Sequence, residues 1–203
     1  MARLIGLTGQ TGAGKSRAAA LFAQEGFAVL DCDRIARQVT QDGSGCLDAL
    51  TEAFSPEILN PDGSLNRRRL GGMVFSDPAL LERLNQVIFP FIRAEIDRQA
   101  ARLAEEGARW ILLDAPTLFE SGAYRQCEAV VAVTAPEGLR KARIMARDSI
   151  SGEAASARMK AQLSEGFFRT HADYLIENSS TEEELRRQVS QTAAALRGGG
   201  SAG

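Results

Sequence analysis

Apolar and polar residues follow one another along the chain in blocks that predict strands and helices in turn. Five short apolar runs have the length of buried strands: Leu4–Leu7, Phe27–Leu30, Trp110–Leu113, Ala129–Val133 and Tyr174–Ile176. The first two runs are separated by a stretch with apolar residues at helical spacing. Because a strand–helix–strand unit implies a parallel sheet with a right-handed crossover, the pattern predicts an α/β fold.

Residues that typically start or stop helices define where the helices are expected. Residues 16–25 form an apolar helical run that Gly26 should end. Asp77 and Pro78 have the residue types of a helix cap and a first helical position. Further helices are expected from Arg34, from Pro136, over Ser151–Glu165 and after Thr181, where Thr181–Glu184 fits a capping box.

The stretch between the second and third predicted strands has a different character. From about Arg34 to Gly107 the strand pattern disappears, and turn signals occur at 42–45 and 60–63. The helix from Pro78 should present one apolar face, formed by Leu80, Leu81, Leu84, Val87 and Ile88. Pro90 should kink or divide that helix. We therefore expect a mostly helical insertion in the α/β core.

A phosphate-binding motif lies between the first strand and the first helix. Gly9–Ser16 fits the pattern G-x-x-x-x-G-K-[ST], in which backbone amides and a helix N-terminus converge on phosphates. Lys15 can then reach the β- and γ-phosphates, and the Ser16 hydroxyl can bind Mg²⁺. A glycine-rich turn can match this pattern by chance, but here strand, loop and helix occur in the required order.

Carboxylates follow two of the predicted strands. Asp31 and Asp33 come after the second strand, and ligands in parallel sheets bind beyond the carboxyl ends of strands. Asp33 can alternatively be only the N-cap of the helix from Arg34, and spacing leaves both roles open. Asp114 follows the third strand and suits an acid that holds Mg²⁺ or its waters. Alternatively, it only hydrogen-bonds the turn at Ala115.

Arginines provide nearly all the positive charge and recur on two predicted helices. Arg140, Arg143 and Arg147 fall on one helical face at i, i+3 and i+7. That face can clamp transferring phosphates, or it can be a plain basic surface. The consecutive residues 67–69 are all arginine and point about 100° apart on a helix, so they cannot all serve one ligand.

Composition narrows the possible functions. A chain of 203 residues with net charge −2 predicts one domain without the overall basic field of a nucleic-acid or membrane binder. The single histidine, His171, excludes a histidine metal cluster and a Ser-His-Asp triad. Three widely spaced cysteines favour a reducing, cytoplasmic compartment, and we find no signal peptide or membrane-length apolar run.

Several motifs together resemble bacterial dephospho-coenzyme A kinase. The resemblance runs from Leu4 to about Val189 and rests first on the phosphate loop. More specific motifs are Leu30-Asp31-Cys32-Asp33-Arg34-Ile35-Ala36-Arg37, Asp62-Gly63-Ser64-Leu65-Asn66-Arg67-Arg68 and Asp114-Ala115-Pro116-Thr117-Leu118-Phe119-Glu120. Arg143, Arg147-Asp148, Gln162, Ala172-Asp173, Ile176 and Asn178 complete it. The chain departs from the usual family pattern at Gln10, Phe89, Thr117 and Phe168.

The resemblance implies transfer of the γ-phosphoryl group of ATP, with Mg²⁺, to the ribose 3′-hydroxyl of dephospho-coenzyme A. It implies a parallel-sheet P-loop kinase core over residues 1–33 and 108–203 of a single domain, 1–203. It further implies an inserted helical substrate domain over 34–107 and a helical lid over 136–169. The expected partners are ATP and dephospho-coenzyme A, with no nucleic acid or membrane, in a monomer or weak homo-oligomer.

The resemblance also implies roles for individual residues. Asp33 would be the base, Lys15 would hold the phosphates, and Arg143 would be the lid arginine at the transferred phosphate. Expected ATP contacts are Gly9, Gly12, Ala13, Gly14, Lys15, Ser16, Arg17, Arg147 and Asn178, with Ser16 the metal ligand. Expected substrate contacts are Asp31, Asp33, Arg37, Leu65, Arg67, Pro116 and Leu118.

Two other functions share parts of these features. Another P-loop small-molecule or nucleotide kinase would keep Lys15, Ser16 and the lid arginines but differ in the insertion. A GTPase-type switch is disfavoured because the chain has no Asn-Lys-x-Asp motif that reads the base. The segment from Asp114 to Thr117 also lacks the glycine of a D-x-x-G switch.

Overall fold

The computed structural model describes residues 2–74 and 77–199. The described residues up to Val29 and from Leu103 onward form one compact unit, and Leu30–Arg102 form the other. The first unit contains most of the sheet, and the second is mostly helical. The two units are described separately below.

The five predicted strands are all present. They are β1 Arg3–Gly9, β2 Ala28–Asp31, β3 Trp110–Asp114, β4 Ala129–Thr134 and β5 Tyr174–Glu177, in the sheet order β2-β3-β1-β4-β5. β1 pairs in parallel with β3 and β4, and β4 pairs in parallel with β5. Leu7 of β1 lies opposite both Asp114 and Val131. The carboxyl ends of β1, β3 and β4 therefore meet at one edge, as the sequence predicts.

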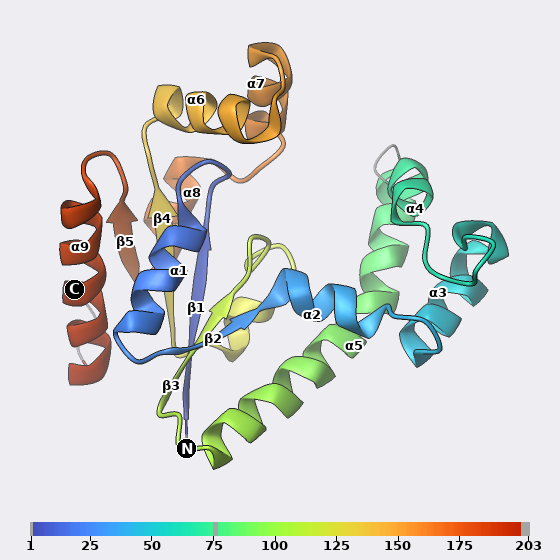
Figure 1. Ribbon diagram of the computed structural model, residues 1–203, viewed down its shortest axis with the longest axis horizontal. Helices are drawn as coiled ribbons and strands as arrows, with labels where there is room; N and C mark the ends of the chain where they lie inside the picture. Colours follow the sequence, from blue (N-terminus) through green and yellow to red (C-terminus); the bar gives the residue numbers. More distant parts are fainter. Residues whose placement is uncertain (1, 75–76, 200–203) are drawn as a thin grey trace. The chain divides into compact units, whose positions relative to one another are not determined.

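The helices of the first unit form two groups (Figure 1). Those beside the sheet are α1 Lys15–Gln24, α8 Glu165–His171 and α9 Glu182–Gly198. α6 Glu137–Asp148 and α7 Gly152–Lys160 pack on each other beyond the carboxyl ends of β1 and β4, and a short 3₁₀ helix, η2, lies at Ala123–Gln126. The core joins α1 and α9 to the strands through fully or almost fully buried side chains such as Leu7, Phe22, Val131 and Leu185. Burial of these side chains is the main stabilising term for this layer.

The helix predicted over Ser151–Glu165 is wrong in its extent. The chain instead forms α7 and α8, joined by residues 161–164. The Ser164 hydroxyl accepts a hydrogen bond from the Phe167 amide at 3.1 Å and starts α8. A serine side chain that satisfies a first-turn amide favours a new helix start over continuation of the preceding helix.

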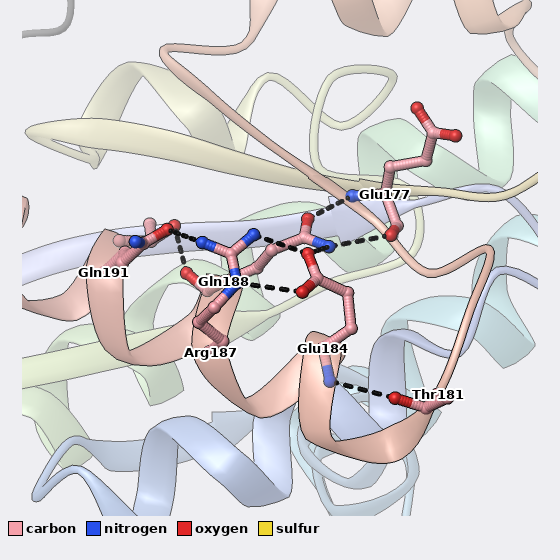
Figure 2. Close-up of polar contacts among 7 residues, drawn as sticks. Glu177, Thr181, Glu184, Arg187, Gln188 and Gln191 are labelled. Carbon is pink, nitrogen blue, oxygen red and sulfur yellow. Dashed lines mark hydrogen bonds and ion pairs between the residues drawn. The ribbon is translucent and has the colours of Figure 1, made fainter.

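Side-chain hydrogen bonds stabilise the start of α9, as Figure 2 shows. The Thr181 hydroxyl accepts a hydrogen bond from the Glu184 amide at 3.3 Å. This confirms the bond that Thr181 contributes to the predicted capping box. The Glu184 carboxylate accepts from Arg187 Nε at 2.8 Å and from Gln188 Nε2 at 3.1 Å. Gln188 Oε1 in turn accepts from the Glu177 amide at 2.9 Å, which ties α9 to β5.

The second unit has its own core. Its helices are α2 Cys32–Val39, α3 Gly45–Phe54, the 3₁₀ helix η1 Pro56–Ile58, α4 Arg67–Val74 and α5 Pro78–Glu105. Cys46, Leu50, Phe54 and Leu70 are buried at its centre. The predicted apolar face of α5 packs on this cluster, with all five residues in contact with it: Leu80, Leu81, Leu84, Val87 and Ile88.

Pro90 lies inside α5 and does not divide it. The alternative that proline would end the helix is therefore wrong. Figure 1 shows that α5 changes direction partway along its length. A proline removes one backbone donor and crowds the preceding turn, so a long helix can continue through it at the cost of a bend.

Candidate functional site

The phosphate loop connects β1 to α1 in a compact turn. Gly14 is the N-cap of α1, with φ +93°, and it has no side chain to cap the first turn. A Cβ at Gly14 would lie 2.2 Å from Asn178 Nδ2, and one at Gly12 would lie 2.7 Å from the Arg140 carbonyl oxygen. The positive φ and these close approaches explain why glycine occupies both positions.

The loop is held in place by hydrogen bonds from three directions. Within the loop, the Ala13 amide donates to the Gln10 carbonyl oxygen at 3.0 Å. The buried Asn178 side chain, beyond β5, donates to the Ala13 carbonyl oxygen at 2.8 Å. The Thr11 amide donates to Gln162 Oε1 at 2.7 Å. These hydrogen bonds to the protein's own groups define the shape of the phosphate loop.

Lys15 and Asp114 form an ion pair at the carboxyl edge of the sheet. Their side chains are 16% and 12% exposed, so the pair is largely removed from water. The predicted turn after Asp114 is held by the backbone, since the Ala115 amide donates to the Leu7 carbonyl oxygen at 3.0 Å. Neither sequence-based alternative for Asp114 included this lysine, because the two residues lie far apart in the chain.

The first turn of α1 presents Ser16 and Arg17 at the surface. Arg17 Nε donates to Glu182 Oε1 at 2.7 Å, and this hydrogen bond raises the pKa of Arg17. In the part of the chain that the structure describes, no three His, Cys, Asp or Glu side chains gather to hold a metal. An exposed hydroxyl at Ser16 suits Mg²⁺, which binds through few protein oxygens together with substrate phosphates and waters.

The three arginines on α6 have different surroundings. Arg143 Nη1 donates to the carbonyl oxygens of Gly12 at 3.3 Å and of Asn178 at 3.2 Å. Arg140 is buried, and this burial lowers its pKa, although nearby Glu137 and Glu165 act in the opposite direction. Within the part of the chain that the structure describes, Arg143 is the one of the three whose side chain donates a hydrogen bond to the phosphate loop.

Arg147 is held by its neighbour in the chain. Its Nε and Nη2 donate to the two carboxylate oxygens of Asp148 at 2.7 Å and 2.8 Å. Hydrogen bonding between these two side chains is the largest cause of the raised pKa of Arg147 and the lowered pKa of Asp148. Arg158 pairs with the same carboxylate. An ATP contact by Arg147 would therefore compete with this exposed ion pair.

The segment after β3 contributes two predicted substrate contacts with different exposure. The Pro116 carbonyl oxygen accepts from the Thr8 hydroxyl at 3.3 Å, and the residue is partly exposed. Leu118 is fully buried, and a Cβ at Gly6 would lie 2.6 Å from its Cδ2. Leu118 therefore packs in the core against Gly6 of β1.

The second unit carries the aspartates that follow β2. Asp31 is the N-cap of α2, and its Oδ1 accepts from the Arg34 amide at 3.0 Å. Asp33 lies inside the first turn and is exposed. The alternative that Asp33 is the N-cap is therefore wrong, because α2 begins at Cys32, earlier than the pattern indicated.

The other predicted substrate residues of the second unit lie at the end of α2 and the start of α4. Arg67 Nη2 donates to the Thr40 hydroxyl at 2.6 Å and to the Arg37 carbonyl oxygen at 3.3 Å. Arg37 itself is exposed. Leu65 is partly buried against the core of this unit.

Two residues that contact or belong to the phosphate loop, Gln162 and Gln10, were assigned no role from the sequence. Gln162 was part of the family motif, but its hydrogen bond to Thr11 joins segments that lie 151 residues apart. Gln10 is 6% exposed, which is unusual for an amide side chain. A polar residue in a glycine-rich loop was the only sequence signal available for Gln10.

Comparison with known proteins adds independent information. A family model for dephospho-CoA kinase matches residues 3–184. A dephospho-CoA kinase from Anaeromyxobacter dehalogenans is 39% identical over 197 residues, which cover 97% of this chain and 93% of that protein. A dephospho-CoA kinase from Oryza sativa subsp. japonica is 37% identical over 189 residues, covering 93% of this chain and 82% of that protein.

Solved structures agree with these sequence comparisons. A protein from Thermus thermophilus has a TM-score of 0.85 at 34% identity, covering 96% of this chain and 97% of its own. A dephospho-CoA kinase from Campylobacter jejuni has a TM-score of 0.71 at 28% identity, covering 98% and 99%. A shikimate kinase from Acinetobacter baumannii, at 15% identity and a TM-score of 0.53, shares the fold. The predicted parallel-sheet P-loop fold is confirmed.

Proposed function

Because the chain belongs to the dephospho-CoA kinase family, we propose that it transfers the γ-phosphoryl group of ATP to the ribose 3′-hydroxyl of dephospho-CoA. The product is coenzyme A. The observation that carries this proposal is the family match over residues 3–184, which includes the phosphate loop, all of the second unit and most of the first. The alternative of another small-molecule kinase has no comparable support, since the shikimate kinases resemble this chain in fold alone.

The proposed chemistry at the phosphate loop is electrostatic. Phosphoryl transfer spreads charge over the transferred group and the leaving oxygen, so catalysis depends on positioning and charge neutralisation. Loop amides such as those of Gly14, Lys15 and Ser16 would cradle the phosphates, whereas the Thr11 and Ala13 amides already donate to Gln162 and Gln10 and would shape the loop. Lys15 would leave Asp114 for the β- and γ-phosphates. Arg143, hydrogen-bonded to the loop at Gly12, would neutralise charge on the transferred group.

Asp33 would orient the acceptor hydroxyl and receive its proton. A ribose hydroxyl is a weak nucleophile at neutral pH, and a positioned carboxylate typically contributes about 10²–10⁴-fold to such a step. Two observations support this role: the Asp33 side chain is exposed, and the capping task belongs to Asp31. Asp31 would then fix the turn from which Asp33 projects.

The remaining contacts are proposed from the family motifs. ATP would also be contacted by Arg17, Arg147 and Asn178, and dephospho-CoA by Asp31, Arg37, Leu65, Arg67, Pro116 and Leu118. We keep the same division of the chain, with a core over 1–33 and 108–203, a substrate region over 34–107 and a lid over 136–169. Arg67 supports this division locally, because it links α4 to the end of α2.

A Mg²⁺ ion would accompany ATP, with the Ser16 hydroxyl as its protein ligand. Bound there, the ion would neutralise charge on the β- and γ-oxygens. Removal of divalent cations with EDTA should abolish turnover, and added Mg²⁺ should restore it. A Ser16→Ala variant should need a higher Mg²⁺ concentration for half-maximal rate. An unchanged Mg²⁺ requirement would contradict the assignment of Ser16.

Location and assembly are also proposals. The odd number and wide spacing of the three cysteines, Cys32, Cys46 and Cys127, support a reducing, cytoplasmic compartment. Within residues 2–74 and 77–199, none of the helices combines the length and the apolar character needed to cross a bilayer. A monomer or weak homo-oligomer is expected, and light scattering across a concentration series would test it.

The deciding experiment measures ADP release with dephospho-CoA as acceptor, coupled to product identification. Phosphorus NMR or mass spectrometry should detect coenzyme A that carries a new 3′-phosphomonoester. Reactions with shikimate or a nucleoside monophosphate in place of dephospho-CoA are the matched controls. ADP release that depends on one of those acceptors, and not on dephospho-CoA, would refute the proposal.

A further inference from the structure

The connection between α7 and α8 is attached to the phosphate loop by two glutamines. From one side, Gln162 Oε1 accepts the Thr11 amide at 2.7 Å. From the other side, Gln10 Nε2 donates to the Leu163 carbonyl oxygen at 3.5 Å, a long bond. Of these two contacts, the one from Gln162 therefore has the stronger geometry.

One buried polar atom of the loop lacks a partner. Among buried side-chain atoms in residues 2–74 and 77–199, those without a hydrogen-bond partner are Gln10 Oε1, Thr134 Oγ1 and Arg140 Nε, and Gln10 belongs to the loop. Because a buried polar atom without a partner is costly, the loop relies on the hydrogen bonds that it does make.

The residues beside Thr11 are packed in place. Gln10 is 6% exposed and Ala13 is fully buried, whereas Thr11 itself is partly exposed. Gly12 is packed against the backbone of α6. Loss of the Gln162 oxygen would therefore leave the Thr11 amide without the acceptor that fixes the orientation of its peptide plane.

We propose that Gln162 is a positioning residue that holds the phosphate loop in its nucleotide-accepting shape. It acts through the Thr11 amide and does not itself touch substrate. Because Gln162 follows α7, the same bond couples the predicted lid segment to the loop. This inference rests on the proposed function for its kinetic consequence, but the hydrogen bond itself can be tested without any substrate.

The test compares Gln162→Met, which keeps the length of the side chain but removes its acceptor, with two other variants. Gln162→Glu retains an oxygen acceptor of the same reach. Gln188→Met is the matched control, because Gln188 Oε1 accepts a backbone amide, that of Glu177, at 2.9 Å elsewhere in the same unit (Figure 2). Hydrogen exchange of the Thr11 amide is followed by NMR in ligand-free protein, and ATP affinity and kcat are then measured.

In Gln162→Met, we expect Thr11 exchange to rise and ATP affinity to fall, each by about threefold to tenfold, the scale of one net hydrogen bond. In Gln162→Glu, Thr11 should remain protected, and in Gln188→Met both readouts should stay at the wild-type level. Unchanged Thr11 exchange in Gln162→Met would overturn the proposal, as would increased exchange with unchanged ATP affinity and kcat. An equal loss of ATP affinity in Gln188→Met would assign the effect to general stability and also overturn it.

Two of the three readouts, Thr11 exchange and ATP affinity, do not depend on which acceptor the protein phosphorylates. If the wild-type protein does not phosphorylate dephospho-CoA, the proposed reaction fails. The exchange and ATP-binding measurements still decide whether Gln162 holds the loop.

Discussion

Replacement of Asp33 by asparagine separates catalysis from stability at the start of α2. Asp33 is exposed in the first turn, and the N-cap hydrogen bond is made by Asp31. Asp33→Asn therefore keeps the cap and the side-chain shape. It loses only the favourable placement of a negative charge near a helix N-terminus, worth about 0.3–1 kcal/mol. For a chain of this size, that corresponds to a fall in melting temperature of about 1–4 °C.

The catalytic effect should be much larger. If Asp33 orients the hydroxyl and receives its proton, the single-turnover rate should fall by about 10²–10⁴-fold. This corresponds to about 3–5 kcal/mol of activation free energy, several times the expected change in stability. ATP affinity should remain within about twofold of wild type, since the change lies at the acceptor.

Asp31 provides a comparison two residues away for the stability of the helix start. Asp31→Ala removes the bond to the Arg34 amide and should cost about 1 kcal/mol of stability, or about 2–4 °C in melting temperature. Asp31→Asn keeps an N-cap side chain and should stay close to the wild-type melting temperature. Melting temperature, ATP affinity and single-turnover rate are measured for all three variants. A single-turnover rate for Asp33→Asn close to that of the wild type would refute the role of Asp33 as base.

The described contacts also predict the effects of replacing Lys15, Arg143 and Glu95. Lys15→Ala should abolish most turnover and also lower the melting temperature, because Asp114 loses its lysine; near-normal kinase activity would reject the phosphate-loop assignment. Arg143→Ala should lower kcat by up to about 10³-fold and weaken ATP binding less; a change in melting temperature alone would assign Arg143 to structure. Hydrogen bonding from Arg98 lowers the pKa of Glu95 to about 2, so Glu95 stabilises the fold above its unfolded pKa, near 4.5. The stability difference between wild type and Glu95→Gln should therefore shrink as the pH falls from about 4.5 towards 2, and a pH-independent difference in urea midpoints would contradict it.

Local pattern was enough to predict the strands and the phosphate loop. The buried runs at Trp110–Leu113 and Ala129–Val133 have few competing interpretations, and β3 and β4 coincide with them to within one residue at each end. The phosphate loop was predictable because glycine, lysine and serine must stand at fixed spacing to serve one anion. The apolar face of α5 was predictable because its five residues repeat at helical spacing.

Boundaries and long-range contacts were not predictable in the same way. The start of α2 depended on which of two aspartates capped it, and both have the residue type of a cap; Asp31 does so by accepting from the Arg34 amide. The break between α7 and α8 depended on Ser164, whose hydroxyl competes with continued helix. The contacts of Lys15 with Asp114 and of Thr11 with Gln162 arise only after distant segments have packed together.

The ion pair between Lys15 and Asp114 changes what nucleotide binding has to accomplish. The Lys15 side chain is only 16% exposed, so the fold itself shields its ammonium group from bulk water. If Lys15 holds the phosphates of ATP as proposed, a phosphate would replace one anion by another at a cation that is already largely dehydrated. Folding would then account for much of that dehydration, and ATP binding would be a competition between the Asp114 carboxylate and the triphosphate.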